Sequence, residues 1–263
     1  MSQAVTATTP VLDFTPAPGA ASFPRIVSSQ ARFDLGLMLR NGEQVLLTLV
    51  IPIAVLVGLA KVPWIDFGSI PRIDVVTPGV FALAVMSTAF TAQAISTGFD
   101  RRYGVLKLLG STPLTRRGLL VSKTLAIAAI EVIQVIIISA VALLLGWSPT
   151  GNAPATILLL ILGTAAFSAL ALAMAGALRA EATLAAANAV FLLLLMVGGT
   201  VIPNDKVPHW LATFGDVLPS GALGSGLRGV LTYGDGLPWG SVLVLLGWIC
   251  IGTFIALRSF KWE

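Results

Sequence analysis

The amino-acid sequence predicts an all-α membrane protein in which six helices cross the bilayer. Of its 263 residues, 56% are hydrophobic and only 11% are charged, whereas a soluble domain carries about 25% charged residues. The charges are unevenly placed, so that long stretches contain none or a single one. A helix needs about 20 apolar residues to cross the hydrocarbon core, and this length is available six times. The predicted spans are about 44–60, 76–98, 119–145, 154–178, 183–202 and 238–257.

The N-terminal part is predicted to lie outside the bilayer. Residues 1–22 are rich in Thr, Pro and Ala and contain no Lys or Arg, which predicts a disordered cytoplasmic tail; residues 23–263 would then form the membrane domain. In residues 24–42 apolar side chains alternate with arginines at near-helical spacing. We expect an amphipathic helix in the headgroup layer, with a short cytoplasmic linker helix as the alternative. The first span is short and contains Pro52, which predicts a kink.

The distribution of basic residues predicts the orientation. With six spans both termini lie on one side, and 12 of the 16 Lys and Arg residues fall on that side. Lys and Arg are retained in the cytoplasm, so both termini should be cytoplasmic. Contact with anionic lipid accounts for the basic composition, and no nucleic-acid partner is needed.

The connection between the second and third spans is predicted to be a contact site. We expect an amphipathic helix over about 99–109 that ends at Gly110, and Pro113 prevents its continuation. Its apolar side chains suit a groove on a cytoplasmic partner, although the helix could instead rest on lipid while its basic residues set the topology. The candidate contact residues are Asp100, Arg101, Arg102, Tyr103, Val105, Leu106, Lys107 and Leu108.

The region between the fifth and sixth spans, residues 203–237, is long but contains few polar residues. Such a segment is unstable in water, so we expect short re-entrant helices that dip into the outer leaflet and are shielded by protein. Its His209 is the only histidine of the chain. Because no second His or Cys is near it, we expect no metal site.

Two polar residues fall in the middle of the third span. Glu131 and Gln134 are three residues apart and therefore share a helix face. A charged side chain at this depth costs about 2.5–3.5 kcal/mol by insertion scales. The pair could line a translocation path or a gate, or it could hydrogen-bond to another helix, for instance through Gln93 or Asn188.

The chain contains no catalytic motif that rises above chance. No Gly-rich nucleotide-binding loop of the Walker type occurs, because Ser122-Lys123-Thr124 lacks the preceding glycines. The chain is therefore not expected to be an enzyme. The energy for active transport would come from a partner or from an ion gradient, so an ion-coupled secondary transporter and a non-transporting scaffold remain alternatives.

Three groups of residues carry a resemblance to a known family. They are Leu39-Arg40-Asn41, then Arg101–Lys107 with Ser111–Leu114, and finally Pro203, Pro208–Leu211, Leu218-Pro219 and Leu227-Arg228. In this order they resemble the ABC-2 type permeases of bacterial exporters, particularly actinobacterial drug-exporter permeases similar to those of daunorubicin resistance.

The resemblance implies a function as well as a fold. Residues 24–42 would be a connecting helix, and Asp100–Leu109 would be the coupling helix that docks on a separate ATPase, with Arg101, Arg102, Tyr103 and Lys107 as its polar part. The chain would act with two ATPase subunits and a second permease copy or homologue in the bacterial inner membrane. It would export an amphipathic drug or a lipid-like substrate. ATP and Mg would bind to the ATPase, and this chain would hold no cofactor.

Overall fold

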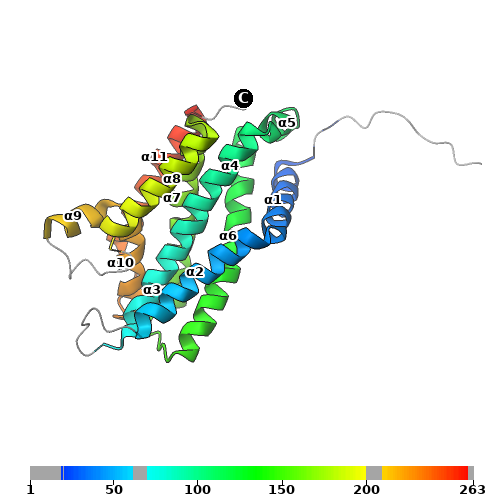
Figure 1. Cartoon of the computed structure of the whole chain (residues 1–263). Helices are drawn as coiled ribbons and strands as arrows, with labels where there is room; N and C mark the ends of the chain where they lie inside the picture. The colour runs from blue at the N-terminus through cyan, green and yellow to red at the C-terminus, as the bar shows by residue number, and fades with distance from the viewer. Residues whose placement is uncertain (1–18, 20, 62–69, 200–208, 260–263) are drawn as a thin grey trace, which may run out of the picture.

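The computed structural model describes residues 19, 21–61, 70–199 and 209–259, and all the regular structure in this part of the chain is helical (Figure 1). The predicted tail falls almost wholly outside the described residues, as do Pro203 and Pro208 of the third motif. The elements are α1 Phe23–Arg40, α2 Gly42–Lys61, α3 Arg72–Val85, the π-helical η1 Met86–Ala92, α4 Gln93–Arg102, α5 Val105–Gly110, α6 Arg116–Leu144, α7 Ala153–Ala177, α8 Ala180–Val197, α9 His209–Val217, α10 Pro219–Leu231 and α11 Trp239–Ser259.

Five helices of the described chain are long and apolar enough to cross a membrane. They are the continuous helix α3–η1–α4 (Arg72–Arg102), α6, α7, α8 and α11 up to Arg258. All five coincide with predicted spans, which confirms an all-α membrane protein. The first predicted span is helix α2, but its apolar part, Thr48–Lys61, is shorter than the others.

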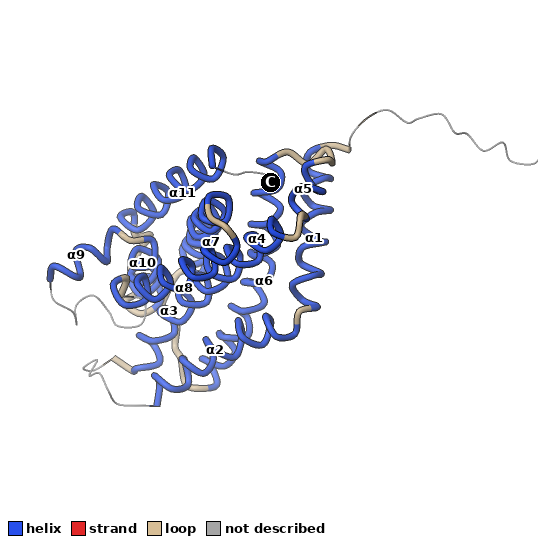
Figure 2. The backbone as a smooth tube through the Cα atoms, turned by 45° about the horizontal axis from the view of Figure 1, so that its top comes forward, coloured by secondary structure: helices blue, strands red, loops and turns tan. Residues whose placement is uncertain are grey.

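The continuous helix α3–η1–α4 is the centre of the bundle (Figure 2). Its apolar window is the most buried of the five, and its segments pack against α2, α6, α7, α8 and α10. Helices α8 and α11 keep most of their surface exposed, as expected of helices that face lipid or a partner. The segment η1 inserts a π-helical turn, in which backbone hydrogen bonds span five residues instead of four.

Short helices α9 and α10 connect α8 to α11, as predicted for this region. Helix α10 is buried over almost its whole length, between α3, α7 and α11. A Cβ atom placed on Gly163 would lie 2.7 Å from the side chain of Leu223, so α10 approaches α7 closely at this point. Gly163 lies ten residues after the start of α7, about 15 Å along its axis. Helix α10 therefore reaches about half-way along α7, which suits a re-entrant helix.

Helix α1 covers most of residues 24–42 and packs on α6. It runs alongside the first turns of α6 (Figure 1). Phe23 at its start lies near Gly118, and Met38 near its end shares a cavity with Ile127. One face of α1, which includes the buried Val27 and Ala31, therefore packs along α6, while Phe33 and Leu37 are more than half exposed. The expected position in the headgroup layer stays a prediction. The pattern of apolar residues suits either surface, because both are apolar.

Candidate functional site

The predicted coupling helix is two helices in the structure. The single helix expected over 99–109 is wrong, because α4 ends at Arg102 and α5 starts at Val105. Between them Gly104 has a φ of +76°. Glycine adopts this left-handed conformation without a steric penalty and commonly ends helices in this way. The turn directs α5 away from the axis of α4, and α5 ends at Gly110 as predicted.

The polar residues at the end of α4 bind to neighbouring helices. The Nζ of Lys123 donates to Asp100 at 2.8 Å and ties α4 to α6. The guanidinium of Arg101 donates to the carbonyls of Ala175 at 3.2 Å and Gly176 at 2.8 Å. These carbonyls belong to the last turn of α7, where the helix dipole favours a positive charge.

The third polar residue of this turn reaches a third helix. Arg102 forms an ion pair with Glu181 in the first turn of α8. Both side chains are more than half exposed, so the pair adds at most about 1 kcal/mol of stability. Consecutive residues of α4 thus bind to α6, α7 and α8 in turn.

The remaining coupling residues divide into a buried and an exposed group. Leu106 is fully buried and packs with Leu114 and Leu119, which fixes α5 to the start of α6. Tyr103 is 73% exposed and Leu108 is 70% exposed, and the side chains of Val105 and Lys107 are exposed as well. The surface available to a partner therefore consists of these four residues, which we call the α5 surface.

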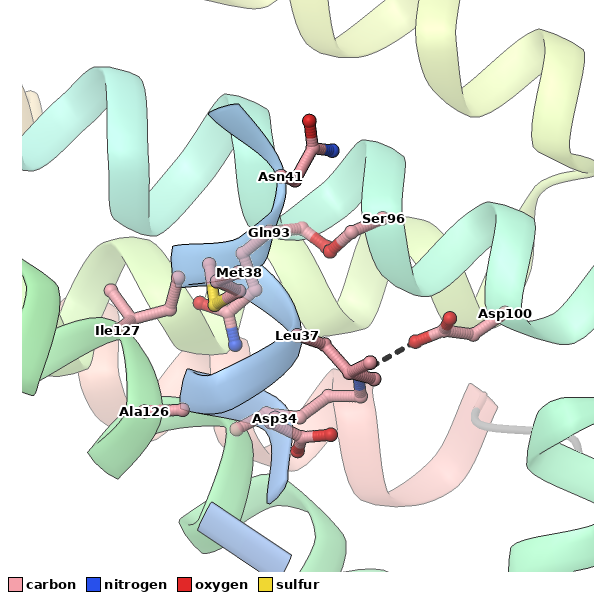
Figure 3. Close-up of a pocket in the computed structure, with 10 residues that line it drawn as sticks. Asp34, Leu37, Met38, Asn41, Gln93, Ser96, Asp100, Ala126 and Ile127 are labelled. Atoms are coloured by element: carbon pink, nitrogen blue, oxygen red, sulfur yellow. Dashed lines mark hydrogen bonds and ion pairs between the residues drawn. The ribbon is translucent and has the colours of Figure 1, made fainter. Parts of the chain in front are cut away.

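A polar cavity of about 160 Å³ lies beside the coupling segment, between α1, α4 and α6 (Figure 3). Its lining residues are Asp34, Leu37, Met38, Asn41, Gln93, Ser96, Asp100, Lys123, Ala126 and Ile127. The dashed line in Figure 3 marks the contact of Asp100 with Lys123. Burial raises the pKa of Asp34 above its usual 3.8, and Asp100 adds to this rise, while Lys123 and Gln30 oppose it.

Two buried polar atoms on this cavity have no hydrogen-bond partner among the described residues. Asp34 accepts from Gln30 at 3.0 Å through one carboxylate oxygen, but its other oxygen has none. Gln93 accepts from Ser168 at 2.7 Å, but its amide nitrogen has none. Buried polar atoms normally have a partner, and the cavity is large enough to hold water.

A second cavity of about 590 Å³ lies between α2, the central helix α3–η1–α4 and α8. Most of its wall is apolar, with a few amide and hydroxyl groups. Its size and character are typical of sites for small organic molecules. Its lining residues are Asn41, Thr48, Ile51, Pro52, Leu83, Ser87, Thr91, Ala92, Ile95, Ser96, Asn188 and Phe191.

Glu131 and Gln134 are buried inside the bundle and are not among the residues that line these two cavities. Glu131 accepts a hydrogen bond from Thr164 of α7. Gln134 donates to the carbonyl of Thr48 on α2 and to the hydroxyl of Thr88 on η1, both at 2.9 Å. Their shared face thus connects α6 to three neighbouring elements.

No three His, Cys, Asp or Glu side chains of the described residues come together as a metal site.

The comparison with protein families identifies the family of the chain. Residues 30–232 match the family described as ABC-2 type transporter. The chain belongs to this family. The matched range starts within α1 and ends just after α10, so it includes the coupling segment of this ABC-2 protein.

One curated relative of this ABC-2 chain is an ABC transporter G family member 20 from Dictyostelium discoideum. It is 30% identical over 76 residues, which are 27% of this chain and 10% of the relative. The chain thus matches only about a tenth of that protein. Together with the apolar helices, the family confirms a multi-pass membrane protein and the ABC-2 part of the resemblance. The resemblance to actinobacterial drug exporters stays a prediction.

Proposed function

We propose that this ABC-2 chain is the permease subunit of an ATP-driven exporter whose ATPase is a separate polypeptide. The observation that carries the proposal is the set of contacts at the end of α4, where Asp100, Arg101 and Arg102 bind to three different helices. A partner that moves α5 would act on all three helices at once. Family membership supports the transporter class, and the finer assignment rests on this geometry.

The ATPase would contact the α5 surface. Tyr103 and Leu108 present apolar area outside the bundle. Tyrosine is a usual anchor of an interface, and burial of Leu108 would add apolar contact beside it. Leu106, which is buried against α6, would transmit the movement. ATP and Mg would be bound by two ATPase subunits, and this chain would supply only the mechanical connection.

The substrate would pass along the second cavity. Its mainly apolar wall with isolated amide and hydroxyl groups suits an amphipathic drug or a lipid-like molecule. Helices α2 and α8 border it, and a second permease copy or homologue packed against them would close the path. Gln134 is then a positioning residue, because it binds to the backbone of Thr48 on the cavity wall. Glu131 would fix α7 relative to α6 through Thr164.

The end of the bundle that carries α5 would face the cytoplasm of a bacterial cell, together with both termini. The starts of α1 and α6 and the end of α11 lie at this end. Labelling of Lys107→Cys in a Cys250→Ser background tests this orientation. We expect that a membrane-impermeant maleimide reacts only after the cells are opened. Labelling in intact cells would contradict the proposal.

The decisive experiment measures the ATPase contact. The complex is purified from its native host, reconstituted in nanodiscs and tested for bound ATPase and ATP hydrolysis. Tyr103→Ala combined with Leu108→Asp should reduce ATPase binding by at least about 30-fold, since anchor residues contribute 2 kcal/mol or more. Tyr233→Ala removes an exposed tyrosine from the connection after α10 and is the matched control. Unchanged ATPase binding in the double variant, or equal loss in the control, would exclude the proposed contact.

A further inference from the structure

We propose that a groove between α6, α7 and α11 binds a phospholipid with an anionic headgroup, with its phosphate at Arg117. The groove has a volume of about 440 Å³ and lies outside both cavities described above. This inference goes beyond the proposed function, because it requires only that the chain spans a membrane.

The shape of the groove follows from small side chains on α7. Ala165 and Ala169 form its floor, while α6 and α11 form its two walls. Helix α11 lies so close to α7 that a Cβ atom on Gly252 would come within 2.9 Å of the Cβ of Ala169. Small residues allow such close contact. The floor therefore stays low between the longer side chains of the walls, and an elongated groove results.

The inner surface of the groove suits an acyl chain. Val121 and Leu125 of the α6 wall are 43% and 48% exposed, and both belong to a membrane span. The hydroxyl of Thr124, also on this wall, donates to the carbonyl of Leu120 at 2.9 Å. Its hydroxyl is thus already bonded within the helix, so contact of Thr124 with an acyl chain would not cost it a hydrogen bond.

One end of the groove carries a positive charge. Arg117 is exposed at the second position of α6 and lines the groove at the end of the bundle where α5 lies. The positive end of the α6 helix dipole also favours an anion there, although the N–H of Gly118 is already bonded to the hydroxyl of Thr115. An apolar groove that ends at a cation is complementary to one kind of molecule in a bilayer, a lipid with an acyl chain and a negatively charged headgroup.

The test measures lipid binding to the purified full-length chain by native mass spectrometry. Phosphatidylglycerol and phosphatidylcholine with identical acyl chains are titrated in parallel. We expect about a fivefold preference for phosphatidylglycerol, because one basic residue near the surface contributes about that factor. Arg117→Ala should remove the preference. Arg116→Ala removes the same charge from the same turn, but Arg116 does not line the groove, and this variant should keep the preference.

A second pair of variants tests the groove itself. Ala165→Leu fills the floor and should reduce retention of both lipids, whereas Ala185→Leu on the exposed face of α8 should not. Thermal unfolding of each variant shows whether it is folded. If the alanine variants do not fold, the comparison of Arg117→Ala with Arg116→Ala decides the proposal. The proposal is overturned by equal binding of the two lipids or by equal effects of the two arginine substitutions. It is also overturned if Ala165→Leu changes the oligomeric mass while lipid retention stays constant, because the groove would then be covered by a second copy.

Discussion

Replacement of Lys123 by methionine tests the connection between α4 and α6. The substitution keeps an unbranched side chain, one atom shorter, and removes the charge between Asp100 and Asp34. Lys123 is 8% exposed and its Nζ lies 2.8 Å from Asp100. Loss of one partner of a buried pair costs about 3–5 kcal/mol. Because the Asp100 side chain is 34% exposed, water recovers part of this, and we expect a loss of about 2–3 kcal/mol.

The effect can be read from thermal unfolding followed by tryptophan fluorescence in a fixed detergent. At about 2–4 °C per kcal/mol, the midpoint should fall by about 5–10 °C. Asp100→Asn in the same chain removes the unpaired carboxylate and should restore much of the loss. A coupling energy of about 1–2 kcal/mol is therefore expected in the double-mutant cycle. If the two single effects add within about 0.5 kcal/mol, the pair does not hold the helices together.

Three further substitutions have defined outcomes. Gly151→Ala places a Cβ atom 2.0 Å from the carbonyl oxygen of Val230, so thermal unfolding should show a loss of 3 kcal/mol or more, on the order of severe overpacking. Arg228→Met removes a buried donor to a carbonyl after the end of α8, and the same assay should show a loss of about 1–3 kcal/mol. Asp34→Asn should abolish a rise in stability on acidification, because burial raises the pKa of Asp34 above 3.8 in the folded state and the folded chain then binds a proton at a higher pH than the unfolded chain.

The predictions for Gly151 and Asp34 each have a control. Gly247→Ala on α11 meets no atom within 4 Å, and it should leave stability unchanged or raise it by about 1 kcal/mol. A loss as large as that of Gly151→Ala would show that any added methyl is harmful. For Asp34, stability is measured between pH 4 and pH 7. If the stability of the wild-type chain changes on acidification in the same way as that of Asp34→Asn, the raised pKa of Asp34 is contradicted.

The membrane spans were predictable because charged residues are costly in the hydrocarbon core, whose thickness sets the length of each span. Five charge-poor stretches became helices that begin and end within a few residues of the expected bounds. The division of the coupling helix was not predictable in this way. Phe99, Tyr103 and Leu106 are spaced i, i+4 and i+7, so the helical pattern continues across Gly104, and only the positive φ of Gly104 shows the turn.

The sequence pattern could not predict which residues contact each other between helices. Glu131 stood out as an expensive group in the bilayer, but its partner Thr164 lies 33 residues further along the chain. No spacing rule connects residues on different helices. The contacts of Asp100, Arg101 and Arg102 with three helices could not be predicted either, since a row of charges after a span is equally typical of a topology signal.

The π-helical turn at Met86–Ala92 has a consequence for side-chain direction along the central helix. One additional residue in a turn rotates everything beyond it by about 100°, the angle between neighbours in an α-helix. Without the additional residue, the side of α4 that meets α8 would be turned by about 100° relative to the side of α3 that meets α10. Deletion of a single residue here would turn Asp100, Arg101 and Arg102 away from α6, α7 and α8 without altering any of them.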